Sequence, residues 1–130
     1  MQAFWDSLID DLKLPTICFV RVLRVLAEIR DALVEVAGSR EAVDEVLDIP
    51  FIKNQAELGL YGWESCTRLL GGVVSIIQRV QEPKREAETR VLWAAVWSTG
   101  SADQAVVFCK ALEVLLGRVN ILRIDAANAR

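Results

Sequence analysis

Apolar residues recur every three or four positions along almost the whole chain, and no stretch alternates convincingly between apolar and polar residues. The first spacing places apolar side chains on one face of an α-helix, whereas strict alternation would mark a half-buried strand. The pattern therefore predicts an all-α fold, divided into helices by prolines and glycines. The expected helices cover residues 2–13, Pro15 to about 37, 39–48, 51–82, Pro83 to Gly100, and Ser101 to about 125.

The expected helix over residues 51–82 is the longest of these, and we expect a kink or break in it at Gly71-Gly72. Each glycine there costs a helix up to about 1 kcal/mol relative to alanine. The connections are short, which favours antiparallel packing of neighbouring helices. We therefore expect a single helical domain over residues 1–130: a compact bundle of about five or six helices, mostly antiparallel, around this long central helix, with the last few residues frayed.

Composition supports a substantial core and argues against nucleic acid as a partner. Hydrophobic residues make up 53% of the chain, which exceeds the usual fraction of about 45–50%. The excess predicts a thick core, an apolar interface with a partner, or both. The net charge is −3, and the fifteen Lys and Arg are scattered among eighteen Asp and Glu. A phosphate-binding surface needs a basic stripe, so no nucleic-acid binding is expected.

The chain has no histidine, and this absence excludes most familiar chemistry. Histidine is the commonest general base and the commonest metal ligand. Ser-His-Asp and Cys-His arrangements are therefore ruled out, and the cysteines form no CxxC pair that could hold a structural zinc ion. We expect no catalytic residue, no cofactor and no metal site, and hence a protein that is not an enzyme.

The three cysteines, Cys18, Cys66 and Cys109, each lie in an apolar helical stretch. Free, buried thiols of this kind fit a reducing compartment, so we expect an intracellular protein, in the cytoplasm by preference. The first residues lack the basic start and apolar run of a signal peptide. The longest uncharged run, residues 91–102, has about twelve residues, fewer than the roughly twenty that cross a bilayer.

Two apolar clusters are candidate interaction sites. Phe4, Trp5 and Leu8 share a face of the first helix, and Trp93 and Trp97 lie four residues apart with no charge between them. Aromatic stripes at this spacing usually pack into a core, but tryptophan is also favoured as an interface anchor. If the first cluster faces a partner, Leu8→Asp should abolish association without unfolding the chain.

Arg30 departs from the pattern of its helix, because it lies between Leu26 and Val34 on the apolar side. A buried guanidinium without a partner is very costly. Arg30 therefore either has a functional role, binding an anion in a pocket between helices or making a contact across an interface, or has a structural one, forming a salt bridge to another helix or extending to the edge of the apolar face. The second interpretation is favoured.

The leading hypothesis is a non-enzymatic helical interaction module or assembly subunit, which engages a protein partner or copies of itself through an apolar helix face. The second hypothesis is a peripheral protein that lays amphipathic helices on a membrane surface. The third is an all-helical ligand binder or enzyme that uses arginine and glutamate, with Arg30 at its centre and Arg68 and Glu64 as further candidates.

Overall fold

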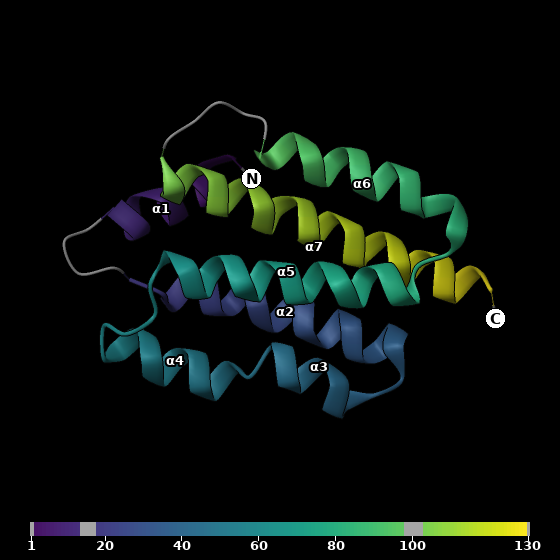
Figure 1. Ribbon diagram of the computed structural model, residues 1–130, viewed down its shortest axis with the longest axis horizontal. Coiled ribbons are helices and arrows are strands. Elements are labelled where there is room, and N and C mark those ends of the chain that lie inside the picture. The colour runs from purple at the N-terminus through teal and green to yellow at the C-terminus, as the bar shows by residue number, and fades with distance from the viewer. Residues whose placement is uncertain (1, 14–17, 98–102, 130) are drawn as a thin grey trace.

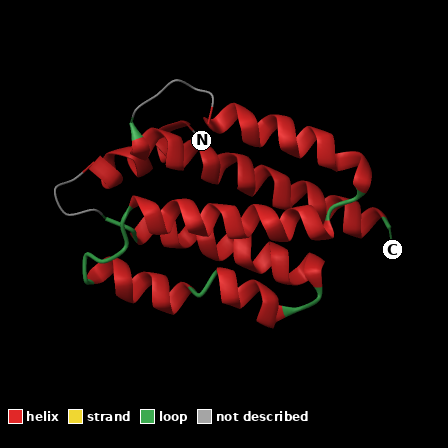
Figure 2. Cartoon of the chain, in the orientation of Figure 1, coloured by secondary structure: helices red, strands yellow, loops and turns green. Residues whose placement is uncertain are grey.

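In the computed structural model, residues 2–13, 18–97 and 103–129 are described, and all regular secondary structure in these ranges is α-helical (Figure 2). The predicted all-α class is confirmed. The described helices are α1 (Gln2–Lys13), α2 (Val20–Ala37), α3 (Arg40–Val46), α4 (Ile49–Glu57), α5 (Trp63–Val80), α6 (Pro83–Trp97) and α7 (Gln104–Asn128).

Helix α7 lies at the centre of the bundle. It packs against α1, α2, α5 and α6, and Figure 1 shows it between α5 and α6, with α2 on the far side. Its buried side chains merge with those of α2 and α5 into a continuous apolar core. The α2 and α5 residues in this core that are wholly shielded from solvent include Leu26, Ile29 and Leu33 of α2 and Val73 and Ile77 of α5.

Short connections make consecutive helices run in opposite directions, as the sequence predicted, with α3 and α4 together forming one return path (Figure 1). The central helices α2, α5 and α7 consequently run in the same direction, because a returning segment separates each from the next. The pair α3–α4 covers the outer side of α2 and α5, and α6 covers α7 on the opposite side of the bundle.

The single long helix expected over residues 51–82 is wrong: two helices, α4 and α5, occupy this stretch. The break falls at residues 58–62, where Gly59 adopts a left-handed φ of 71°. The amide of Leu60 donates to the carbonyl of Gln55 at 2.8 Å, and the amide of Gly59 donates to that of Ala56 at 3.0 Å. These two bonds form the Schellman motif that ends a helix at a glycine. Gly71-Gly72, where we expected the break, lies inside α5.

Three other helix ends also differ from expectation. Pro15, Gly100 and Ser101 lie outside the described residues. Helix α2 is seen to begin at Val20. Helix α7 is capped by Asp103, whose carboxylate accepts hydrogen bonds from the amides of Ala105 and Val106. It continues to Asn128, past the end expected near residue 125.

Gly72 permits a close approach between α3 and α5. A Cβ atom added there would lie 2.8 Å from Cγ1 of Val46, whereas a Cβ added at the adjacent Gly71 would meet nothing within 4 Å. Valine is branched at Cβ and stiff, so Val46 cannot easily move aside. The two neighbouring glycines therefore have different roles, and packing requires glycine only at position 72.

This difference predicts opposite effects of one substitution at neighbouring positions. Gly71→Ala should raise the free energy of unfolding by up to about 1 kcal/mol, because alanine is the better helix former. Gly72→Ala should be less stable than Gly71→Ala by about 1–3 kcal/mol, because its methyl group overpacks the contact with Val46. Urea denaturation followed by circular dichroism measures both. Equal stability of the two variants would contradict the close approach of α3 to α5.

Candidate functional site

The C-terminal half of α6 exposes an unusual amount of apolar surface. Residues 91–97 carry no charge, yet Val91, Leu92 and Trp97 are 68%, 39% and 47% exposed. The main packing partner of α6 is α7, and the residues of α6 that are fully buried are Thr89 and Val96. Since one side of this helix faces α7, its apolar outer side is left to solvent.

Helices α5 and α6 diverge from the corner where residues 81 and 82 join them, and α7 lies between them (Figure 1). At the wide end of this V the three helices enclose a groove of about 240 Å³. We call it the α5–α7 groove. The residues that line it are Trp63, Cys66, Thr67 and Leu70 of α5, Trp97 of α6, and Gln104, Val107 and Phe108 of α7.

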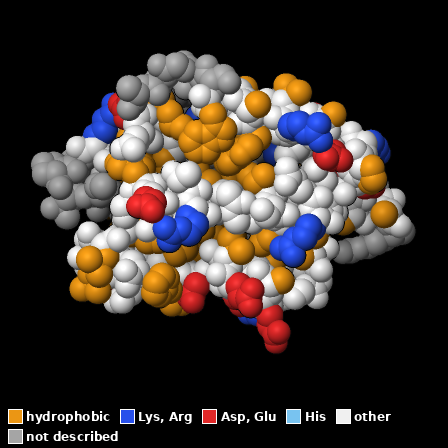
Figure 3. Space-filling model, viewed as in Figure 1, with side chains coloured by type: hydrophobic (Ala, Val, Ile, Leu, Met, Phe, Trp, Pro, Cys, Tyr) orange, Lys and Arg blue, Asp and Glu red, His pale blue; other side chains and the backbone are white. Residues whose placement is uncertain are grey.

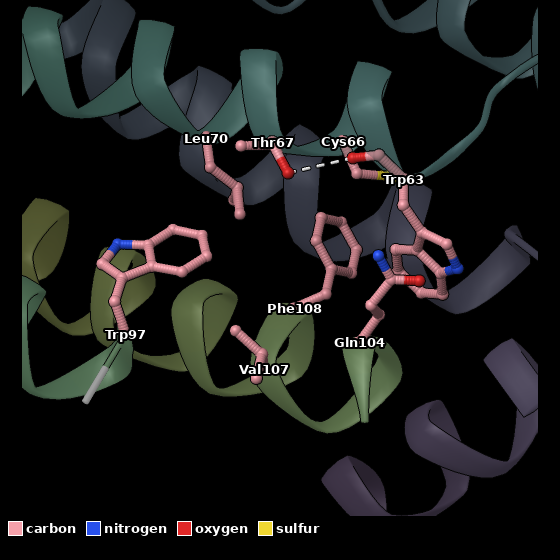
Figure 4. Close-up of a pocket in the computed structure, with 8 residues that line it drawn as sticks. All are labelled: Trp63, Cys66, Thr67, Leu70, Trp97, Gln104, Val107 and Phe108. Carbon is pink, nitrogen blue, oxygen red and sulfur yellow. Dashed lines mark hydrogen bonds between the residues drawn. The ribbon is translucent and has the colours of Figure 1, made fainter. Parts of the chain in front are cut away.

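Aromatic rings form the walls of the α5–α7 groove. The rings of Trp63 and Phe108 meet edge to face, with centroids 5.9 Å apart, and join the start of α5 to α7. Figure 4 shows Trp97 approaching from α6, with Phe108 between it and Trp63 in this view. Trp93 supports Trp97 by a second edge-to-face contact at 5.6 Å. Trp97 is thus a partly exposed ring held beside an apolar hollow.

Apolar side chains gather on the molecular surface over the region where α5, α6 and α7 meet (Figure 3). Tryptophan and phenylalanine offer large contact areas and are favoured at interface centres. The groove and the exposed side of α6 at Val91, Leu92 and Trp97 therefore form one candidate binding surface, suited to apolar side chains.

The polar groups in this groove offer little for catalysis. The hydroxyl of Thr67 donates to the carbonyl of Trp63 at 3.0 Å, which is a bond within α5. Burial raises the pKa of the Cys66 thiol to about 12, so the thiol stays protonated at neutral pH and is a poor nucleophile. Gln104 lies at the exposed edge. The groove can bind apolar groups, but it does not activate an attacking atom.

The structure separates the five residues predicted to face a partner. Leu8 is fully buried and Trp5 is 6% exposed, because α1 uses its apolar face to pack against α7. Phe4 is half-buried against the same core, in edge contact with Trp5. The expectation that Trp5 and Leu8 are accessible is therefore corrected, and Leu8→Asp would disrupt the core itself. Trp93 is half-buried, and Trp97 remains accessible.

Arg30 lies between α2 and α3 with its side chain 29% exposed. Its guanidinium pairs with the adjacent Asp31 at 3.0 Å and faces Asp44 of α3 at 3.9 Å. Arg68 and Glu64 pair with each other on the exposed side of α5, at 3.4 Å. The structure therefore does not bring the three residues of the ligand-binding hypothesis together: Arg68 and Glu64 pair on α5, and Arg30 pairs within α2 and, through Asp44, with α3.

The most deeply buried arginine of the described chain is Arg118 on α7, which is 4% exposed. Sequence reasoning missed it, although its position four residues after Val114 and four before Leu122 places it on an apolar face. Its Nη1 atom donates to Glu88 of α6 at 2.7 Å. A second ion pair, between Arg85 of α6 and Asp125 of α7, lies beside it. These contacts join the charged half of α6 to α7.

A second hollow of about 540 Å³ lies between α3–α4 and α5. Charged residues at its lining include Glu45, Asp48 and Arg68, beside apolar Val46, Ile52 and Leu69. Phe51, at its edge, is 56% exposed. Its other aromatic residue, Tyr61, packs edge to face against Phe19, with ring centroids 5.8 Å apart.

Within the described ranges, no cluster of acidic or cysteine side chains could hold a metal ion. The same part of the chain has no helix that is both long and apolar enough to pass through a bilayer.

Comparison with protein families gives a match over the whole sequence. The family model described as Tcp11, T-complex protein 11, matches residues 1–130. No curated protein matches the chain, and no solved structure does. The family is therefore identified from sequence, while the geometry of the groove is known from this structure.

The burial of two thiols predicts their reactivity. Burial raises the pKa of Cys109, like that of Cys66, to about 12, so at pH 8 only about one molecule in 10⁴ carries either thiolate. Iodoacetamide should label half-buried Cys18 first and the other two slowly, with faster labelling as the pH rises. Peptide mass spectrometry measures this order. Labelling of Cys66 as fast as that of Cys18 at pH 8 would instead show an activated thiol in the groove.

Proposed function

This chain belongs to the Tcp11 (T-complex protein 11) family, and we propose that it acts as a non-enzymatic helical interaction module. Its proposed ligand is an amphipathic helix of a partner protein, bound along the outer side of α6 with an apolar side chain in the α5–α7 groove. The observation that carries this proposal is Trp97, which is 47% exposed at the end of an uncharged helix segment and beside an aromatic hollow.

The size and lining of the groove favour a side chain over a free small molecule. Small-molecule sites usually enclose about 300–1,000 Å³ and contain several convergent polar groups. The α5–α7 groove has about 240 Å³, and the hydroxyl of Thr67 is already bonded to its own helix. A large apolar side chain, carried by a helix that also covers Val91 and Leu92, would fill the groove and shield the exposed side of α6.

An amphipathic helix suits this surface because α6 is uncharged over almost two turns. Helix-in-groove recognition uses apolar anchors at positions i, i+3 or i+4, and i+7 of the bound helix. The charged half of α6 supports a protein partner over an anionic membrane. It carries Lys84, Arg85 and Arg90 beside Glu86 and Glu88, so its net charge is only +1, whereas segments that attract acidic lipids carry clusters of about four to eight Lys and Arg.

The test is a selection of helical peptides from a display library on the wild-type chain, followed by fluorescence anisotropy with purified variants. Trp97→Glu should weaken binding of the selected peptides by at least about tenfold, because it removes an interface anchor. Phe51→Glu is the matched control: it places the same charge at another exposed aromatic residue, beside the second hollow, and should bind like wild type. Both variants should keep nearly wild-type stability, since both positions are exposed.

Three results would contradict the proposal. The first is equal peptide binding by wild type and Trp97→Glu, and the second is loss of binding in Phe51→Glu instead. The third is a dimer of the wild-type chain, measured by light scattering, that Val91→Glu converts to monomer. In that case a second copy of the chain, and not a partner's helix, would cover α6.

A further inference from the structure

Helix α6 is joined to α7 by a cluster of four charged side chains. The Nε and Nη2 atoms of Arg85 donate to the two carboxylate oxygens of Asp125, each at 3.1 Å. Arg118 of α7 donates to Glu88 of α6 at 2.7 Å, and Glu88 also faces Arg85 at 3.7 Å. We call these four residues the α6 clasp. Both helices contribute one arginine and one carboxylate to it.

Two members of the α6 clasp are withdrawn from water. The side chains of Arg118 and Asp125 are 4% and 11% exposed. The Nε atom of Arg118 is buried without a hydrogen-bond partner among the described residues, so Glu88 supplies the counter-charge to this guanidinium. Removing one partner of a buried ion pair is strongly destabilising, because it leaves the other charge uncompensated. Glu88 is therefore the hydrogen-bonded counter-charge of Arg118, while Asp125 acts on the same guanidinium through its charge alone.

The apolar contribution of α6 to the core is small by comparison. Val96 is its one buried aliphatic side chain in the described structure, and half-buried Trp93 packs beside it. Helix α5, only slightly longer, buries seven residues. Elements with few buried apolar contacts open locally at a lower free-energy cost than the rest of a domain. The packing of α6 against α7 therefore depends on the ion pairs of the α6 clasp more than on buried apolar side chains.

We propose that α6 opens away from α7 as a unit while α2, α5 and α7 stay folded, and that the α6 clasp controls this opening. Trp97 is carried by α6, so opening removes one wall of the α5–α7 groove. The clasp would then determine how often the groove is complete. This inference depends on the ion pairs between α6 and α7, and it holds whether or not a partner's helix binds in the groove.

Protonation acts on the clasp in a defined direction. The hydrogen bond from Arg118 lowers the pKa of Glu88, and the hydrogen bond from Arg85 lowers that of Asp125. Other charges that act on these carboxylates are Arg85 and Asp125 on Glu88, and Lys84 and Arg118 on Asp125. A lowered pKa in the folded state adds stability at neutral pH that is lost as the pH falls through that pKa. The clasp is therefore closed at pH 7 and weakens only in acid.

The test is native-state hydrogen exchange on the chain without any partner, measured by mass spectrometry at pH 7. In wild type, the amides of residues 90–97 should exchange faster than those of α5 and α7. Glu88→Ala should accelerate exchange of residues 90–97 by about tenfold or more, because it removes the carboxylate that is hydrogen-bonded to buried Arg118. Exchange in α2 and α5 should stay at the wild-type rate.

Glu86→Ala is the matched control. Glu86 lies on the same helix and pairs with Arg90 of α6 at 2.7 Å, so its removal breaks an ion pair of similar length that does not reach α7. An exposed pair of this kind contributes little to stability, and exchange should match wild type. If Glu88→Ala and Glu86→Ala behave alike, or if all helices exchange at one common rate, the proposal is overturned.

The effect of Glu88→Ala in an Arg118→Met variant shows whether Glu88 acts through its ion pair with Arg118 or through a general destabilisation of α6. In Arg118→Met the buried guanidinium that Glu88 pairs with is gone, so adding Glu88→Ala should accelerate exchange far less than it does in wild type. If Glu88→Ala has the same effect in both backgrounds, Glu88 does not act through Arg118 and the proposal fails. No peptide is present in these experiments, so failure of the proposed helix binding would leave their outcome unchanged.

Discussion

Helix α7 can bury its apolar side chains only because α1, α2, α5 and α6 all pack against it. This requirement explains why the apolar face of α1, with Trp5 and Leu8, is turned inward. The returning segments α3–α4 and α6 in turn let α2 and α5 run parallel to α7 in the centre of the bundle. Each of these four helices packs one face against α7. The apolar surface that a helix leaves exposed depends on how much of its own circumference is buried in the bundle.

Helix α6 buries the smallest share of its residues among these four helices, namely Thr89 and Val96. The candidate site arises from the apolar residues that it leaves exposed. Its contact with α7 combines Val96 and Trp93 with ion pairs, so its other apolar residues are left exposed. The exposure of Val91, Leu92 and Trp97 to water is unfavourable in free energy, since burying apolar surface contributes about 25 cal/mol per Å². Covering this surface with another apolar helix would recover that free energy, which is the physical basis of the proposed interaction.

Much of the fold could be predicted from the sequence, because helical periodicity is local and proline and glycine mark helix ends. The end of α2 at Gly38, in a left-handed conformation, follows from such a signal. The break after α4 was missed because Leu58, Leu60 and Tyr61 continue the apolar pattern across it. Gly59 carried the relevant signal, but a glycine inside a periodic stretch is read as a helix end only when its backbone conformation is known.

The candidate site could be predicted only in part. The uncharged run with Trp93 and Trp97 is visible in the sequence, and Trp97 proved accessible. The similar pattern at Trp5 and Leu8 marks a helix face that is buried in the core. Periodicity identifies an apolar face but does not identify what covers it. Arg118 was missed for a related reason: its partner Glu88 lies thirty residues away on another helix, and no local pattern joins the two.

The central claim is that the outer side of α6 and the α5–α7 groove form the binding surface. The most direct measurement is the NMR signal of the indole N–H of each of the four tryptophans during titration with a selected helical peptide. The account predicts that the signals of Trp97, Trp93 and Trp63 shift as the peptide binds, while that of buried Trp5 stays in place. Peptide binding that shifts Trp5 and leaves Trp97 unchanged would contradict it.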